Sequence, residues 1–316
     1  TAWAQVGSKA YITFSTKEHG NELWTYDVNT NTLAWMTENL FPGASAYVGN
    51  ARHQIAFGTD VYFTAWTVDL GRELYKTDGT VAGTYLVKDI MPGNPEGGPF
   101  TTGPTAFIVF NGELFFTADD GTEGRELWKT DGTNAGTVMV DPVLGDPADG
   151  IGSNPDYAPT PAALFYAANG NLFYLTTSPD TITDVDSVNY GGIYNLAVLG
   201  TELFFGAEAT DPLDTIGTEL YKSDGTTITL AEDILPTADE SSSPSNLYAF
   251  NGRLYFQAAR AQDPNNVWSK EYELFEYYYD NSDVDPNNWA WVLTDKDLNP
   301  TTNTSGFGNS SYPGNF

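Results

Sequence analysis

Carboxylate side chains recur at fixed places in this sequence, within a phrase that reads Glu-Leu-aromatic-x-x-Asp-Gly-Thr. A carboxylate close to a hydroxyl could bind a metal ion or act in acid–base catalysis. One active site does not need several copies of its acid, however, and an Asp-Gly-Thr turn has a structural use. Asp accepts hydrogen bonds from backbone N–H groups, Gly supplies a positive φ, and Thr begins the next strand. We therefore assign these residues to the fold: Glu73, Asp78, Gly79, Glu126, Asp131, Gly132, Glu219, Asp224 and Gly225.

The phrase returns about every fifty residues, which is typical of a repeat protein. It is complete at 73–80, 126–133 and 219–226, and weaker copies at 22–27 and 273–280 keep the strand but lose Gly-Thr. The interval between the second and third complete copies is nearly twice the usual one, so it holds one degenerate unit. The recurring glutamates are expected to form hydrogen bonds between units.

Within one unit the pattern predicts four strands, at 106–110, 113–118, 126–130 and 137–143, joined by short turns such as Asn111-Gly112. Their adjacent apolar residues indicate burial on both faces. With no helical periodicity anywhere, such units predict an all-β protein, a β-propeller of four-stranded antiparallel blades. Six blades are expected, with five or seven as alternatives.

The fourth unit is the degenerate one. A hairpin signal at Asn169-Gly170 leads into an apolar strand, and no Glu-Leu-aromatic strand follows. We therefore expect this blade to have lost strands. The whole chain, 1–316, is read as one propeller domain, with units of approximately 1–42, 43–95, 96–145, 146–190, 191–240 and 241–300 and a closing tail at 301–316.

Charge excludes one class of partner. The sequence has 42 acidic and 13 basic groups, a net charge of −29, which would repel a phosphate backbone, so nucleic acid is not an expected partner.

There is no Cys, and hence no disulfide framework and no thiolate site. No apolar run approaches the ~20 residues that span a bilayer, so we expect a protein that is not integral to a membrane.

Catalytic constellations are hard to find. His19 and His53 are the two imidazoles, and neither has a second metal ligand at a suitable spacing. A Gly-x-Ser-x-Gly nucleophile elbow is absent from the sequence. Arg52, Arg253 and Arg260 do not form a visible sialidase-like triad. A glycosidase with paired carboxylates stays open, because only the fold could bring two acids together.

Ligand binding is expected instead at residues that break the repeat, since propellers place function in such loops. Trp66, Trp268 and Trp289 lie off the aromatic column of the motif, and exposed rings there could stack on sugars. Buried packing is the alternative for each of them.

An acidic run in the sixth unit could bind Ca²⁺. Asp283, Asp285 and Asn287 stand at alternate positions and Asp280 precedes them, so several oxygens could face one hard cation. The run lacks the glycine and the last glutamate of an EF-hand. A solvated acidic loop is the alternative.

The phrases at 73–80, 126–133 and 219–226 resemble those of the bacterial ELWxxDGT-repeat proteins, and the similarity covers most of the chain outside roughly 145–190. The resemblance implies a β-propeller in secreted or surface-attached proteins without an established activity. The chain starts Thr1-Ala2-Trp3, with no Met and no leader, so we expect a fragment or a processed product whose export signal has been removed.

Together these features predict a secreted or cell-surface module that is not an enzyme. Its role would be adhesion or the assembly of a matrix or filament, with a polysaccharide, a surface protein or a second copy of itself as partner. The alternative is a secreted hydrolase or lyase that acts on polysaccharides, with carboxylates gathered over the propeller axis.

Overall fold

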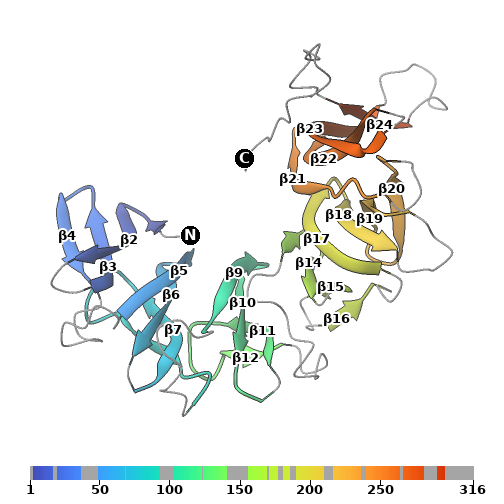
Figure 1. The fold of residues 1–316 in the computed structure, drawn as a ribbon. Helices are drawn as coiled ribbons and strands as arrows, with labels where there is room; N and C mark the ends of the chain where they lie inside the picture. The colour runs from blue at the N-terminus through green and yellow to red at the C-terminus, as the bar shows by residue number, and fades with distance from the viewer. Residues whose placement is uncertain are drawn as a thin grey trace. The chain divides into compact units, whose positions relative to one another are not determined.

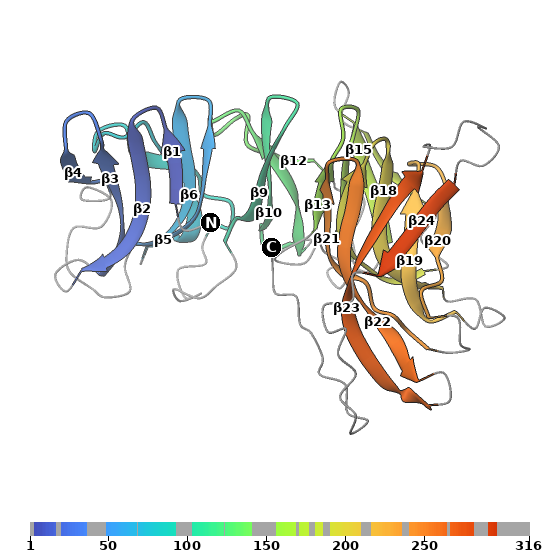
Figure 2. The ribbon, with the colours of Figure 1, turned by 90° about the horizontal axis from the view of Figure 1, so that it is seen from above.

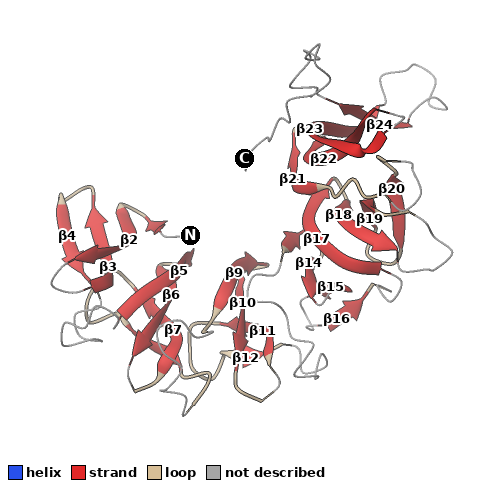
Figure 3. Cartoon of the chain, in the orientation of Figure 1, coloured by secondary structure: helices blue, strands red, loops and turns tan. Residues whose placement is uncertain are grey.

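A computed structural model divides the chain into two compact units, Thr1–Pro155 and Asp156–Phe316 (Figure 1). The residues that the structure describes are 3–16, 20–36, 49–67, 69–92, 103–122, 124–140, 156–168, 171–176, 181–185, 190–209, 216–235, 240–263, 266–280 and 290–295. These residues form strands, turns and irregular segments (Figure 3). No helix occurs among them, and therefore none that could cross a membrane.

The first unit contains three antiparallel sheets of four strands, each a meander in chain order. The first sheet has β1 (Trp3–Val6), β2 (Lys9–Thr16), β3 (Gly20–Asp27) and β4 (Thr32–Trp35). The second has β5 (Gly49–Phe57), β6 (Asp60–Thr67), β7 (Gly71–Thr77) and β8 (Tyr85–Lys88). The third has β9 (Thr105–Phe110), β10 (Glu113–Asp119), β11 (Arg125–Thr130) and β12 (Val138–Met139).

The second unit also contains three such sheets. The fourth sheet has β13 (Tyr157–Pro159), β14 (Leu164–Ala168), β15 (Asn171–Thr176) and β16 (Thr181–Asp184). The fifth has β17 (Tyr190–Leu199), β18 (Glu202–Ala209), β19 (Thr218–Ser223) and β20 (Ile228–Glu232). The sixth has β21 (Ser245–Phe250), β22 (Arg253–Asp263), β23 (Asn266–Asp280) and β24 (Ala290–Asp295), and its long β22–β23 hairpin extends beyond the neighbouring strands (Figure 2).

Local sequence explains the meander. Asn111 and Gly112 have φ values of 48° and 78°, which is the left-handed geometry that a two-residue hairpin turn requires. The first three strands predicted for this unit agree with β9, β10 and β11 to within a residue. The fourth is shorter than predicted, because only Val138 and Met139 pair with β11 in the described residues.

Hydrophobic cores lie between consecutive sheets of each unit. Phe63 of β6 packs with Tyr11 of β2 in one core, whereas the next residue back, Tyr62, packs with Phe116 of β10 in another. The second sheet therefore buries both faces, as its adjacent apolar residues predict. In the second unit, Phe205 and Phe204 of the fifth sheet divide in the same way between two cores.

The fourth sheet corrects one expectation. It has four strands, so the prediction that this unit lost strands is wrong. Leu172 of β15 accepts a hydrogen bond from Val185 N at 2.9 Å, and the motif residues Leu23 and Leu127 accept the equivalent bonds from Met36 N and Val140 N. Hence β15 is the Glu-Leu-aromatic strand, with Asn171 in place of Glu. The Asn-Gly signal misled because it marks a hairpin without saying which pair of strands the hairpin joins.

Candidate functional site

The Asp-Gly-Thr turn has one geometry in three sheets. Asp78 Oδ1 accepts hydrogen bonds from Thr80 N at 2.8 Å and from Thr80 Oγ1 at 2.6 Å, and Gly79 has a φ of 83°. The threonine hydroxyl, followed by the backbone, lowers the pKa of Asp78. Thr80 closes the turn and does not begin a strand, which differs from expectation. The same pair of bonds recurs at Asp131 with Thr133 and at Asp224 with Thr226.

Two further residues belong to this turn, and the sequence reasoning missed them. Thr84 Oγ1 donates to Thr80 O at 2.7 Å, and a Cβ on Gly83 would overlap the carboxylate of Asp78. The third sheet repeats both features at Gly136 and Thr137. The sequence does contain a signal for these two turn residues, because the dipeptide Gly-Thr recurs at 83–84 and 136–137.

Each turn packs against the preceding sheet of its own unit. A Cβ on Gly79 would lie 2.5 Å from Tyr11 Oη, and Lys9 Nζ donates to Gly79 O at 3.0 Å. A Cβ on Gly132 would overlap Tyr62 Oη and lie 3.2 Å from Lys76 Nζ. The motif glycines are therefore fixed by this close approach as well as by their positive φ.

An ion pair fills the corner beneath such a turn. Lys76 of β7 lies 3.1 Å from Asp60, the first residue of β6, and its ammonium stands 5.9 Å from the centre of the Tyr62 ring. In the third and fifth sheets the same strand positions hold Lys129 with Glu113, at 2.8 Å, and Lys222 with Glu202, at 2.7 Å.

The fourth sheet has no ion pair at this corner. Strand pairing aligns Phe165 and Tyr174 with Tyr62 and Lys76, so an aromatic ring stands where the lysine is. Ala163, whose carbonyl accepts a hydrogen bond from Thr160 N across the turn, directly precedes β14 and takes the position of the acid in the other sheets. Two charged side chains are thus replaced by a methyl group and a ring.

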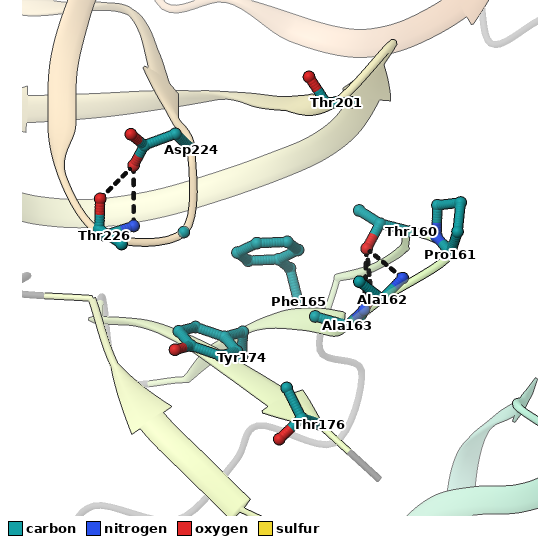
Figure 4. A pocket seen from close by; sticks show the side chains of 11 residues that line it. Thr160, Pro161, Ala162, Ala163, Phe165, Tyr174, Thr176, Thr201, Asp224 and Thr226 are labelled. Atoms are coloured by element: carbon teal, nitrogen blue, oxygen red, sulfur yellow. Dashed lines mark hydrogen bonds between the residues drawn. The ribbon is translucent and has the colours of Figure 1, made fainter.

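A pocket of about 380 Å³ opens at this corner (Figure 4). Phe165 and Tyr174 stand side by side at its floor, with ring centroids 5.7 Å apart and planes inclined by 47°. Its volume is that of a small-molecule or side-chain site. The lining residues are Thr160, Pro161, Ala162, Ala163, Phe165, Tyr174, Thr176, Thr201, Asp224, Gly225 and Thr226.

Asp224 supplies the one carboxylate among these lining residues. Its Oδ1 accepts hydrogen bonds from Thr226 Oγ1, Thr226 N and Thr227 N, and these bonds lower the pKa of Asp224 to about 2. The carboxylate is therefore ionised at neutral pH. The described lining residues include no His, Ser, Cys or Lys.

Two motif glutamates, Glu73 and Glu219, are buried and bind backbone amides. Glu219 accepts hydrogen bonds from Ile234 N at 2.9 Å and Ser242 N at 2.8 Å, and so holds the segment that leads from β20 to β21. Glu73 accepts from Ile90 N at 2.7 Å. Burial raises the pKa of both, in Glu73 to about 8.

No tryptophan occurs among the described residues that line the pocket. Trp66 is buried, with 9% of its surface exposed. Trp268 lies in β23 with its side chain outside the described part, and Trp289 lies outside the described residues. Of the three arginines considered, Arg253 is engaged by Glu276 at 2.6 Å, and the side chain of Arg260 is also undescribed.

Metal-binding candidates are little represented in the described structure. Asp283, Asp285 and Asn287 lie outside the described residues, and Asp280 ends β23 with its side chain undescribed. Where residues are described, no group of three His, Cys, Asp or Glu side chains could hold an ion. Burial lowers the pKa of His53 to about 4, so this imidazole is neutral at neutral pH.

Comparison with known proteins gives a fold but no sequence family. No family model and no curated protein matches the chain. Among solved structures, oligopeptidase B from Leishmania major matches 90% of this chain and 39% of its own, with 11% identity and a TM-score of 0.52. One of two prolyl endopeptidases analysed together matches 93% of this chain and 49% of its own, with 10% identity and a TM-score of 0.50. The β-propeller domain of the Trilobed protease from Pyrococcus furiosus matches 93% of this chain and 83% of its own, with 10% identity and a TM-score of 0.41.

The six four-stranded sheets and the likeness to oligopeptidase B place the chain in the β-propeller fold class, as the repeat predicts. The chain spans about half or less of the oligopeptidase B and prolyl endopeptidase chains. The resemblance to the ELWxxDGT-repeat proteins stays a prediction.

The same comparisons correct the functional expectation. A non-catalytic extracellular module for adhesion or assembly, with a polysaccharide-acting hydrolase or lyase as alternative, is contradicted, because the two similar structures with a TM-score of 0.50 or more, oligopeptidase B and the prolyl endopeptidase, are peptidases. The error has a physical origin. The repeated residues maintain the fold, and a fold does not specify a function.

Proposed function

We propose that this chain is the β-propeller part of a peptidase and that it controls which peptides reach a separate catalytic domain. The likeness to oligopeptidase B and to the prolyl endopeptidase carries this proposal, because each match covers most of this chain and under half of the other. In the prolyl endopeptidases, inter-domain dynamics have a role in catalysis and specificity. A propeller that moves against a catalytic domain could exert such control here.

In this proposal the chain performs no bond cleavage itself. Its carboxylates serve the fold where their contacts are described: Asp78 and Asp131 close turns, and Glu73 and Glu219 bind backbone amides. The catalytic groups would come from residues outside this sequence. Export from the cell also stays a prediction, which fractionation of the source cells would test.

Peptides of increasing length, each with a fluorogenic cleavage site, test the proposal. The full product of the gene should cleave short peptides and discriminate against long ones, and a variant without residues 1–316 should lose this discrimination. The chain alone should cleave none. A full product without peptidase activity, or cleavage by the chain alone, would overturn the proposal.

A further inference from the structure

The pocket between the fourth and fifth sheets marks the place where an internal cation is missing. In the second sheet, the ammonium of Lys76 lies over the Tyr62 ring, pairs with Asp60 and sits beneath the turn that contains Gly132. Lys76 is also one of the groups that lower the pKa of Asp131 in that turn. The Lys76 ammonium therefore interacts with the Tyr62 ring on one side and with the carboxylate of Asp131 in the turn.

The fourth sheet keeps the surroundings of this cation and lacks the cation itself. Phe165 replaces Tyr62 as the ring, and Gly225 with Asp224 forms the turn. Tyr174 takes the place of the lysine and adds a second aromatic ring. A Cβ added to Gly225 would lie 3.4 Å or more from the Phe165 ring, and among the described residues no polar side chain lies within 4 Å of it. Open volume is therefore left beneath this turn.

We propose that this pocket binds the side chain of an arginine in a peptide, whose guanidinium takes the place that Lys76 occupies in the second sheet. A planar guanidinium stacks on aromatic rings, and its methylene stem suits a lining of Ala, Pro and ring carbons. Arg253 gives an example within this chain, with its guanidinium 4.0 Å from the centre of the Tyr278 ring.

Charge favours the same occupant. The hydrogen bonds that Asp224 accepts within the described residues end on Oδ1, so Oδ2 can receive a guanidinium N–H at the rim. The net charge of −29 also attracts cationic peptides from solution. This inference stands independently of the proposed peptidase role, because it concerns binding and not cleavage.

The probe is a short peptide, acetyl-Gly-Arg-Gly-amide, titrated into the ¹⁵N-labelled chain. The amide signals of Ala163, Gly225 and Thr226 should shift, and added salt should weaken the binding. The same peptide with citrulline in place of arginine is neutral and of equal shape, and its affinity should be lower by at least about tenfold. Equal binding of both peptides, or no shift with the arginine peptide, would overturn the proposal.

Two variants place the site. Ala163→Glu with Tyr174→Lys restores the pair seen at Glu113 and Lys129, fills the corner with an internal cation and should abolish binding. Asp224→Asn keeps an acceptor for the turn and should weaken binding, whereas the matched change Asp131→Asn, in a turn without this pocket, should leave it unchanged. Thermal melts confirm folding. Undiminished binding by the double variant or by Asp224→Asn would contradict the assignment.

Discussion

Arg253 of β22 donates a hydrogen bond from Nη1 to Oε1 of Glu276 on β23, across 2.6 Å. In the third sheet the same strand positions hold Glu113 and Lys129, at 2.8 Å. The sixth sheet therefore reverses both charges and keeps the pair. Glu276 is nearly buried, with a side-chain exposure of 6%, so this carboxylate depends on its partner.

Reversal of one charge in this pair should destabilise the second unit. Arg253→Glu places two carboxylates side by side and should lower the melting temperature. Adding Glu276→Lys recreates the polarity of the third sheet and should recover most of the loss, which thermal melts of the single and double variants measure. If the double variant melts no higher than Arg253→Glu, the pair does not act as a unit.

Loss of a turn carboxylate should cost stability. Asp131→Ala removes the acceptor for Thr133 N and Thr133 Oγ1 and should lower the free energy of unfolding by roughly 1–2 kcal/mol. Urea melts measure this change. Asp131→Asn keeps one oxygen acceptor and is the control, so it should lie closer to the wild type. Equal losses in both variants would assign the effect to charge and not to the turn.

Two glycines separate backbone strain from packing on the next sheet. Gly112 and Gly132 both have positive φ, 78° and 89°, but a Cβ at Gly112 would meet open space, whereas at Gly132 it would overlap Tyr62 Oη. Gly112→Ala should cost about 1 kcal/mol for the left-handed conformation. Gly132→Ala should cost roughly 1–3 kcal/mol more. Equal costs in urea melts would show that Tyr62 can move aside freely.

Stability should fall as pH rises through the titration of Glu73. Burial raises the pKa of this carboxyl from 4.5 to about 8. The folded state therefore holds the proton more tightly than the unfolded chain does. The resulting stabilisation is complete below pH 4.5 and is lost as pH rises from 4.5 to 8.

Glu73→Gln cannot ionise, so its stability relative to the wild type should rise across that range. Urea melts at several pH values give the comparison. Parallel curves for the two proteins would show that Glu73 does not titrate in this range.

Calcium binding is a prediction from sequence alone. If Asp283 and Asp285 bind Ca²⁺, adding the ion should raise the melting temperature, because a ligand bound to the folded state stabilises it. Asp283→Ala with Asp285→Ala should abolish that rise, and Mg²⁺ serves as a comparison ion. A rise of equal size in the double variant would place the ion elsewhere.

Local chemistry in the sequence determined the repeated elements. Glu-Leu-aromatic strands, Asn-Gly hairpins and Asp-Gly-Thr turns each depend on residues close together in the chain, so they predict the meander correctly. The burial of both sheet faces also follows from adjacent apolar residues, such as Phe115 and Phe116.

Tertiary structure alone decided the register of the fourth sheet and the pocket above it. An Asn-Gly signal is satisfied by any hairpin, and only the bond from Val185 N to Leu172 O shows which strand carries the motif position. Ala163 and Tyr174 line the pocket together with Asp224, which lies in a turn between two strands of another sheet. These residues are far apart in the chain, so no local pattern contains the pocket.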